Sequence, residues 1–354
     1  MNNTYLMKKA MIEAAVTRGI RQMEEDPERS ARRLADLGKQ FSGNRFQEIV
    51  FSVIQELLDN ENSAYYDMIH NMLKNTNHDA MRTFGVNFGY MSFAYGASKI
   101  RDEEKVLGYC IPWCLMLRYD ETLEDGLSLG DLQKLMEEGQ ELGIYAYFIR
   151  QSANSVGSYS LLTLLERCKD SSFIWFQESG RLTAAQIQML KVCKNTVVAL
   201  PVLDDESMLT AELLRDQKVP FALYSTYDDQ FAGETVNRIM EHVLASETSM
   251  FFLIAEDGTA LNVTKYCYDS RLEQDYPCVL MDYYGDGRSI SRILAEHDNL
   301  LEIGADGYVI RPDGSRGVRF PSELPLKEAL AEIMPPFTAA SHHNRQRTET
   351  IQKK

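Results

Sequence analysis

The sequence predicts an α/β protein built on a parallel sheet. Six short apolar segments recur between residues 113 and 255, and stretches with amphipathic helical periodicity alternate with them. Strands that helices cover on both faces are typically continuous apolar runs, so the alternation favours a parallel sheet. Right-handed crossovers then leave two architectures, a curved partial barrel or a doubly wound sheet. No G-x-G-x-x-G follows the first strand, so the Rossmann phosphate loop is absent.

The strands and helices are assigned from their apolar patterns and corner residues. Ser128 and Asp131 form an S-x-x-D cap that opens the first helix of the alternating region. The strands are expected at Trp113–Tyr119, Ile144–Ile149, Phe173–Gln177, Thr196–Val202, Pro220–Tyr224 and Ser249–Ala255. The helices are expected near 129–142, 159–168, 183–193, 206–217 and 232–245.

The N-terminal region, residues 1–80, contains helical patterns and no strand pattern. Apolar residues recur at helical spacing in Tyr5–Glu25 and 45–58, and a third run lies at 65–73. These stripes must be buried, either on the chain's own barrel or on a second chain. Residues 82–96, RTFGVNFGYMSFAYG, are rich in aromatics and glycine, which suits a segment pressed against other backbone.

The pattern loosens after residue 260. The stretch 300–314, LLEIGADGYVIRPDG, predicts a hairpin with turns at 305–307 and 312–314, and a helix follows near 325–333. The expected organisation is a helical region at 1–80, a barrel at 81–260, a C-terminal segment at 261–334 and a disordered tail at 335–354.

Composition excludes several classes of function. The chain has 354 residues, 44% of them hydrophobic, and a formal net charge of −15. No cluster of Lys and Arg lies outside the last few residues, which argues against nucleic acid and anionic membranes as partners. Neither a signal peptide nor an apolar run of membrane-spanning length is present. Six scattered cysteines predict reduced thiols in a cytoplasmic protein.

Candidate site residues follow the strands, because ligands of parallel α/β sheets meet the carboxyl ends of the strands. Polar residues there are also typical of solvated loops, and only Arg150 and Glu178, immediately beyond strands, stand out. None of the six histidines has metal-clamping spacing, and Asp204 with Asp205 suggests a helix N-terminus more than a catalytic pair. The predicted pocket consists of Asp120, Arg150, Gln177, Glu178, Asp204 and Glu256.

Several stretches together resemble the radical S-adenosylmethionine (radical SAM) superfamily, in particular a clostridial-type group with an N-terminal helical extension and a C-terminal SPASM-like segment. They are GYCIPWCLML, LSLGDLQKLMEEGQELGIYAYF, ERCKDSSFIWFQESGRLT, YPCVLMDYYGDG and LLEIGADGYVIRPDG. The resemblance covers most of residues 80–333 and implies a partial (β/α)6 TIM-like barrel. In that family a C-x3-C-x2-C loop after the first strand holds a [4Fe–4S] cluster, and a "GGEP" turn after the second contacts S-adenosylmethionine.

The chain departs from this family where its cofactors bind. The loop after the first strand is RYDETLEDG (118–126), which offers carboxylates where iron–sulfur ligation needs thiolates. The "GGEP" turn falls on Arg150-Gln151-Ser152-Ala153, so its glycines and its acidic residue are gone. Asp313 stands where the family has an auxiliary-cluster cysteine. Both [4Fe–4S] and S-adenosylmethionine are therefore expected to be lost, and no cofactor is predicted.

Cys110 and Cys114 do not replace the missing loop. They flank Ile-Pro-Trp before or within the first strand, on the wrong side of it, and lack a third thiol. Side chains alternate along a strand, so Cys114 is expected to pack in the barrel wall or against helices.

The leading hypothesis is a radical-SAM-like protein that acts by binding, as a partner or regulatory subunit. Its expected partners are an active radical SAM relative, a peptide or metabolite, or a second copy joined through the N-terminal helices. Two alternatives stay open. One is an enzyme that uses a divalent metal or general acid–base catalysis at the barrel mouth, through carboxylates at Asp120, Glu178, Asp204, Asp228 and Glu256. The other is a radical SAM enzyme with atypical cluster ligands.

Overall fold

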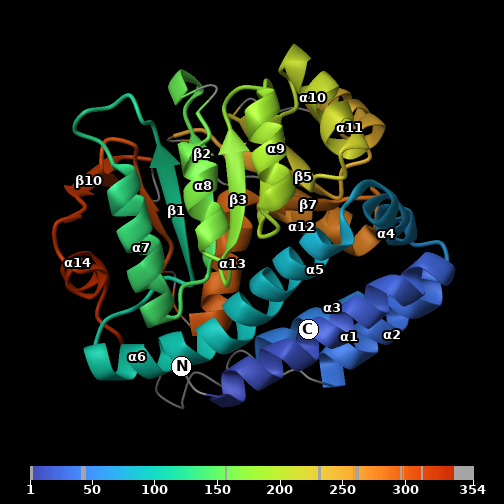
Figure 1. Ribbon diagram of the computed structural model, residues 1–354, viewed down its shortest axis with the longest axis horizontal. Helices are drawn as coiled ribbons and strands as arrows, with labels where there is room; N and C mark the ends of the chain where they lie inside the picture. The colour runs from blue at the N-terminus through green and yellow to red at the C-terminus, as the bar shows by residue number, and fades with distance from the viewer. Residues whose placement is uncertain are drawn as a thin grey trace.

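A ten-stranded sheet forms the centre of the computed structural model (Figure 1). The structure describes residues 3–40, 45–155, 158–229, 233–257, 259, 263–295, 297, 299–311 and 314–338. The strands are β1 (Cys114–Tyr119), β2 (Ala146–Gln151), β3 (Ser172–Gln177), β4 (Thr196–Pro201), β5 (Phe221–Tyr227), β6 (Met250–Ala255), β7 (Val279–Asp282), β8 (Leu301–Ile303), β9 (Tyr308–Ile310) and β10 (Arg316–Arg319).

The strand order is β10-β9-β8-β1-β2-β3-β4-β5-β6-β7. All neighbours from β8 through β1 to β7 are parallel, whereas β9 and β10 add antiparallel to the β8 edge. This confirms the predicted α/β class with a parallel sheet. The partial barrel is open because, among the described strands, β7 and β8 end the parallel series without pairing with each other.

The parallel series has eight strands, two more than the sequence predicted. The additional strands, β7 and β8, contain four and three residues, too few to give a clear apolar pattern. They pair with β6 and β1, so the sheet continues beyond residue 260. The hairpin predicted at 300–314 is confirmed as β8 and β9, in which Glu302 pairs with Ile310. Asp313 lies outside the described residues.

Helices cover the convex face of the sheet, and α7 and α8 lie on its near side in Figure 1. The predicted cap of α7 is confirmed, because Ser128 Oγ accepts from Asp131 N at 3.1 Å and the Asp131 carboxylate accepts from Ser128 N at 2.9 Å. These helices are α7 (Leu129–Leu142), α8 (Ser160–Arg167), α9 (Ala184–Val192), α10 (Asp205–Asp216), α11 (Gly233–Ser246) and α12 (Thr264–Glu273), with a short 3-10 turn at Ala153–Ser155.

Helix α13 (Tyr283–Ala295) connects β7 to β8 and lies on the opposite side of the sheet from α7 and α8 (Figure 1). Its first residue, Tyr283, packs edge-to-face on Phe148 of β2 and Phe176 of β3, with ring centroids 5.8 and 5.3 Å apart. Phe176 also lies 5.3 Å from Phe252 of β6. Strands three positions apart are about 14 Å apart in a flat sheet. The sheet is therefore strongly curved, and α13 begins on its concave face.

The N-terminal helices bury part of their apolar stripes on their own chain. They are α1 (Asn3–Glu25), α2 (Pro27–Gln40), α3 (Arg45–Asp59), α4 (Ala64–Asn75), α5 (His78–Val86), the π-helix η1 (Asn87–Gly96) and α6 (Ala97–Leu107). Ile20, Leu58, Tyr66 and Leu73 belong to a core that α1 to α4 share. Figure 1 shows α5 and α6 crossing beneath the amino ends of the strands, with α1 to α3 below them.

The glycine-rich segment 82–96 is pressed against other backbone, as its composition predicts. A Cβ at Gly96 would lie 2.3 Å from the carbonyl oxygen of Gly143, at the corner between α7 and β2. Such a contact excludes every side chain, so only glycine fits. The close approach fixes the helical layer to the sheet.

The end of the described chain is attached to the barrel. After α14 (Leu326–Ile333), Pro335 O accepts from Cys110 N and Phe337 N donates to Gly108 O, both at 2.9 Å. The tail predicted from residue 335 therefore begins with paired backbone, and residues 339–354 lie outside the described part. None of the described helices is both long and apolar enough to cross a membrane.

Candidate binding site at the carboxyl ends of the strands

Arg118 on β1 connects the loop after β6 and strand β8 at the carboxyl end of the sheet. Its guanidinium donates to both carboxylate oxygens of Asp257, after β6, at 2.6 and 3.0 Å. Its Nε donates to Glu302 of β8 at 2.9 Å, and the second oxygen of Glu302 accepts from Tyr284 OH on α13 at 2.8 Å. The network therefore links the end of β6 to β8 through side chains, across the open side of the barrel between β7 and β8.

The contacts of this network stabilise the charged forms of Arg118 and Asp257. Burial alone would lower the pKa of Arg118, but hydrogen bonds to Asp257 and the charge of Glu302 outweigh it and raise that pKa. The hydrogen bond from Arg118 in turn lowers the pKa of Asp257, against the effect of its partial burial. The ion pair is charged at neutral pH, and all three nitrogens of the Arg118 guanidinium donate to Asp257, Glu302 or Tyr284.

Arg150 on β2 is the register partner of Arg118 on β1, and its side chain projects from the same concave face. Its partly buried guanidinium makes no hydrogen bond or ion pair with any residue that the structure describes. Burial and the charge of Arg118 lower its pKa, while Tyr284, Tyr283 and Glu302 raise it, and the net shift is upward. Arg150 is thus a charged fork of five donors held beside a second cation.

Tyr283 contributes a second polar group without a partner. Its hydroxyl is buried, and among the described residues nothing hydrogen-bonds to it. Burial raises the pKa of Tyr283 well above its ordinary value, so the hydroxyl stays protonated. Buried polar groups in proteins are nearly always paired, and one that is not requires an explanation. The guanidinium of Arg150 and the phenol of Tyr283, neither of which has a hydrogen-bond partner among the described residues, can together donate to a carboxylate.

Asp120 of the predicted pocket has a structural role. Its carboxylate accepts from Thr122 N at 2.9 Å, Thr122 Oγ1 at 2.6 Å and Asn154 Nδ2 at 3.0 Å. Burial raises its pKa, but these hydrogen bonds outweigh burial and lower it to about 2. Asp120 therefore fixes the loop after β1 against the loop after β2.

Gln177 does not lie on the same face as Arg150, so the prediction that both line one opening is corrected. Trp175 Nε1 and Gln177 Nε2 both donate to Gln151 Oε1, at 2.8 and 3.0 Å. Tyr147, four residues before Gln151 on β2 and therefore on the same face, donates to Met136 O of α7. These side chains therefore pack under the convex helices. Arg150 and Gln151 also belong to β2 itself, which extends two residues beyond the predicted strand end.

Glu178 and Asp204 are placed at the mouth but are not brought together as a catalytic pair. Glu178 follows β3, and its exposed carboxylate accepts from Ala153 N at 3.4 Å. Asp204 is the N-cap of α10, accepting from Glu206 N, and its other oxygen accepts from Gly180 N, both at 2.9 Å. The interpretation of Asp204 and Asp205 as a helix N-terminus is confirmed.

Glu256 is exposed, and its neighbour Asp257 makes the ion pair instead. Asp228, from the metal alternative, follows β5. Among the described residues no group of three His, Cys, Asp or Glu side chains is placed to hold a metal ion. The carboxylates at the strand ends thus serve separate loops rather than one centre.

The cysteines do not fit a [4Fe–4S] cluster at the mouth. Cys110 and Cys114 precede or begin β1, at the end of the sheet opposite Asp120. Burial raises the pKa of the Cys110 thiol to about 11 and that of Cys114 well above its ordinary value. All six thiols are free and buried. The loop after β1, where the family has its ligands, offers oxygen donors only.

The predicted pocket omitted the four residues of the observed network, Arg118, Asp257, Tyr284 and Glu302, and the unpartnered Tyr283. One signal was available, because Glu302 is a lone carboxylate inside the apolar run LLEI. A buried charge of this kind requires a partner. That partner, Arg118, lies 184 residues away in the sequence and can be identified only from the fold.

No family model and no curated protein matches the chain. Among solved structures it is similar to SuiB of Streptococcus suis bound to S-adenosylmethionine, with TM-score 0.47 and 10% identity over 66% of this chain and 67% of SuiB. It is also similar to methylornithine synthase PylB, with TM-score 0.37 and 11% identity over 79% and 99% of the two chains. At these scores the likenesses carry no argument about family or activity.

Proposed function

We propose that this chain is a radical-SAM-like protein without cluster or S-adenosylmethionine sites, and that it works by binding a carboxylate-bearing ligand, a small acid or peptide, at the barrel mouth. The observation that carries the proposal is the contrast between two adjacent arginines. Arg118 is saturated by Asp257 and Glu302, whereas Arg150 has a charged guanidinium and no described partner. A planar carboxylate matches the fork geometry of a guanidinium.

The surroundings of Arg150 support the same ligand class. Tyr283 holds an unpartnered hydroxyl on the same concave face, and Tyr224 packs on Phe176 beside it with ring centroids 5.5 Å apart. The charge of Arg150 lowers the pKa of Tyr224 against the larger raising effect of burial, so the two side chains are close. A carboxylate between Arg150 and Tyr283 would satisfy both donors, and the aromatic rings would shield it from water.

The proposal that the chain binds a ligand without catalysing a reaction rests on the thiols and carboxylates that the chain offers as metal ligands or catalytic groups. Thiols are buried away from the mouth, and the carboxylates of Asp120 and Asp204 are engaged in loop contacts. No observation favours the divalent-metal alternative over binding. A cytoplasmic location and a regulatory or subunit role belong to the same proposal.

The binding test compares a tripeptide that has a free C-terminal carboxylate with the same tripeptide as its carboxamide, by calorimetric titration. We expect the acid to bind and the amide to bind at least about tenfold more weakly, since a charged hydrogen-bonded pair contributes roughly 1.5–3 kcal/mol. Arg150→Gln should remove this preference, and Tyr283→Phe should reduce it. Equal binding of acid and amide, or full preference in Arg150→Gln, contradicts the proposed site.

A second copy joined through the N-terminal helices remains a proposal. Leu6, Met7 and Met11 of α1 are 49%, 62% and 58% exposed. An apolar strip of this kind fits a partner better than water. Light scattering of the intact chain and of a Met7→Ser/Met11→Ser variant distinguishes a dimer that depends on this strip from a monomer.

A further inference from the structure

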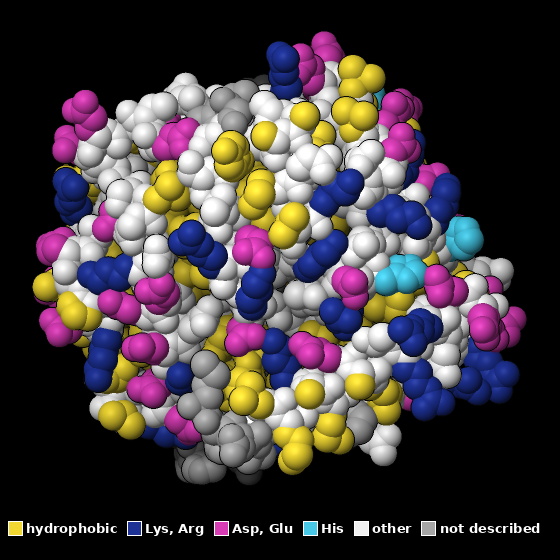
Figure 2. All heavy atoms as spheres, in the orientation of Figure 1, with side chains coloured by type: hydrophobic (Ala, Val, Ile, Leu, Met, Phe, Trp, Pro, Cys, Tyr) yellow, Lys and Arg dark blue, Asp and Glu magenta, His cyan; other side chains and the backbone are white. Residues whose placement is uncertain are grey.

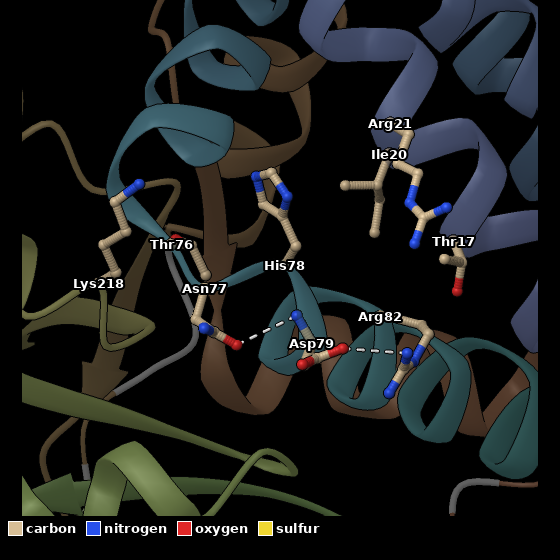
Figure 3. Close-up of a pocket in the computed structure, with 9 residues that line it drawn as sticks. All are labelled: Thr17, Ile20, Arg21, Thr76, Asn77, His78, Asp79, Arg82 and Lys218. Carbon is tan, nitrogen blue, oxygen red and sulfur yellow. Dashed lines mark hydrogen bonds and ion pairs between the residues drawn. The ribbon is translucent and has the colours of Figure 1, made fainter.

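A cavity of about 310 Å³ lies at the amino end of the sheet, far from the mouth. Figure 3 shows it between α1, the turn that opens α5, and the turn before β5. Its volume is at the lower end of the range typical of small-molecule sites. It is lined by Thr17, Ile20, Arg21, Thr76, Asn77, His78, Asp79, Arg82 and Lys218.

The cavity is positively charged although the chain carries a net charge of −15. Three of the lining side chains are Arg or Lys and one is Asp. Asp79 pairs with Arg82 at 3.1 Å. The side chains of Arg21 and Lys218 have no hydrogen bond or ion pair with any described residue, and Figure 3 shows them on opposite sides of the hollow.

This charge is local. Figure 2 shows acidic and basic side chains interspersed over the same face of the molecule, so no broad basic surface explains the cluster. An anion bound between these two cations would pair with both charges. The cluster is therefore better suited to a ligand than to the stability of the fold.

The turn before β5, which carries Lys218, is fixed to the turn that opens α5. Asn77 N donates to the carbonyl oxygen of Lys218 at 2.8 Å, and Asn77 Oδ1 accepts from Asp79 N and Ala80 N at 3.1 Å. Lys194 Nζ also donates to Asn77 Oδ1 at 3.2 Å, bringing a further cation close. Lys218 has φ +53°, the left-handed conformation that commonly ends a helix, and it directly follows the C-cap of α10.

We propose that this cavity binds a small phosphate-bearing molecule, with the phosphate between Arg21 and Lys218. Phosphate offers three acceptor oxygens and so can use cations from opposite walls, which one planar carboxylate cannot do as well. Ile20 gives an apolar contact for the organic part of the ligand. The hollow is too small for a folded partner, which favours a metabolite over a phosphorylated protein. This site is independent of the carboxylate site at the mouth.

The test is calorimetric titration of the full chain with inorganic pyrophosphate at constant ionic strength. Wild type should bind one equivalent, and Arg21→Gln and Lys218→Gln should each weaken binding by roughly tenfold, as expected for a lost charged hydrogen bond. Both side chains are exposed, so the variants should fold normally. Lys8→Gln removes the same charge from an exposed position early in α1 and is the matched control.

The outcomes separate the two sites. Binding that weakens in Arg21→Gln and Lys218→Gln, but not in Lys8→Gln or Arg150→Gln, supports the cavity as the phosphate site. No saturable binding at millimolar pyrophosphate overturns the proposal. Equal weakening by Lys8→Gln also overturns it, because the effect would then be one of net charge. Loss of binding in Arg150→Gln alone would place the anion at the mouth and overturn it as well.

Discussion

Arg118 on β1 and Arg150 on β2 are register partners that lie side by side on the concave face, yet only Arg118 forms ion pairs with carboxylates. This asymmetry predicts unequal effects of their substitution on stability. Arg118→Gln leaves the buried Glu302 without its cation and should lower the free energy of unfolding by about 3 kcal/mol. Arg150→Gln removes a cation that repels Arg118 and should change it by less than about 1 kcal/mol, or raise it. Urea unfolding of the three proteins without ligand measures both effects, and a larger loss in Arg150→Gln would contradict the assignment.

The same pair shows how much of the site the sequence could predict. Arg150 was found because it ends a strand, but its lack of a partner depends on Asp257 and Glu302, which are brought to Arg118 across 139 and 184 residues. Successive side chains of a strand point to opposite faces, so the sequence predicts that Gln177 and Glu178 lie on different faces of the sheet. Which face is concave follows only from the curvature of the folded sheet. The strand pattern of residues 114–255 was predictable because burial on both faces makes those strands apolar throughout.

Glu104 on α6 predicts a pH-dependent stability. Its carboxylate is fully buried, one oxygen accepts from Ile111 N at 2.8 Å, and the other has no described partner. Burial raises its pKa from 4.5 to about 7, against the smaller lowering effects of Ile111 N and Arg101. Between pH 4.5 and about 7, Glu104 is therefore protonated in the folded protein and ionised in the unfolded chain. The free energy of unfolding falls as pH rises through this range.

Glu104→Gln should remove this dependence because the amide keeps the acceptor for Ile111 N and carries no charge. At pH well above 7 the variant should be more stable than wild type by roughly 2–3 kcal/mol, and the difference should vanish below the unfolded pKa. Chemical denaturation across this pH range measures the difference. A variant less stable than wild type in alkaline buffer would show that the ionised carboxylate is stabilised by its surroundings.

Asp120 predicts the reverse dependence at acid pH. Hydrogen bonds lower its folded pKa from 3.8 to about 2, so its contribution is present above 3.8 and is lost as pH falls through 2. In Asp120→Asn, the new amide NH2 group would point at Thr122 or Asn154, which are themselves donors. The substitution should therefore lower the free energy of unfolding by about 2 kcal/mol at neutral pH. The cost should shrink at the acid end of the range. Asp125→Asn, an exposed position in the same loop, is the control and should be neutral.

Anaerobic reconstitution with iron and sulfide, followed by an assay for 5′-deoxyadenosine from S-adenosylmethionine, tests most directly whether the chain works by binding rather than by radical chemistry. The loop at 118–126 offers oxygen donors and the thiols are buried, so we expect no stoichiometric iron and no cleavage product above a protein-free control. Stoichiometric iron and sulfide that disappear in Cys110→Ser or Cys114→Ser, together with formation of 5′-deoxyadenosine, would contradict the account.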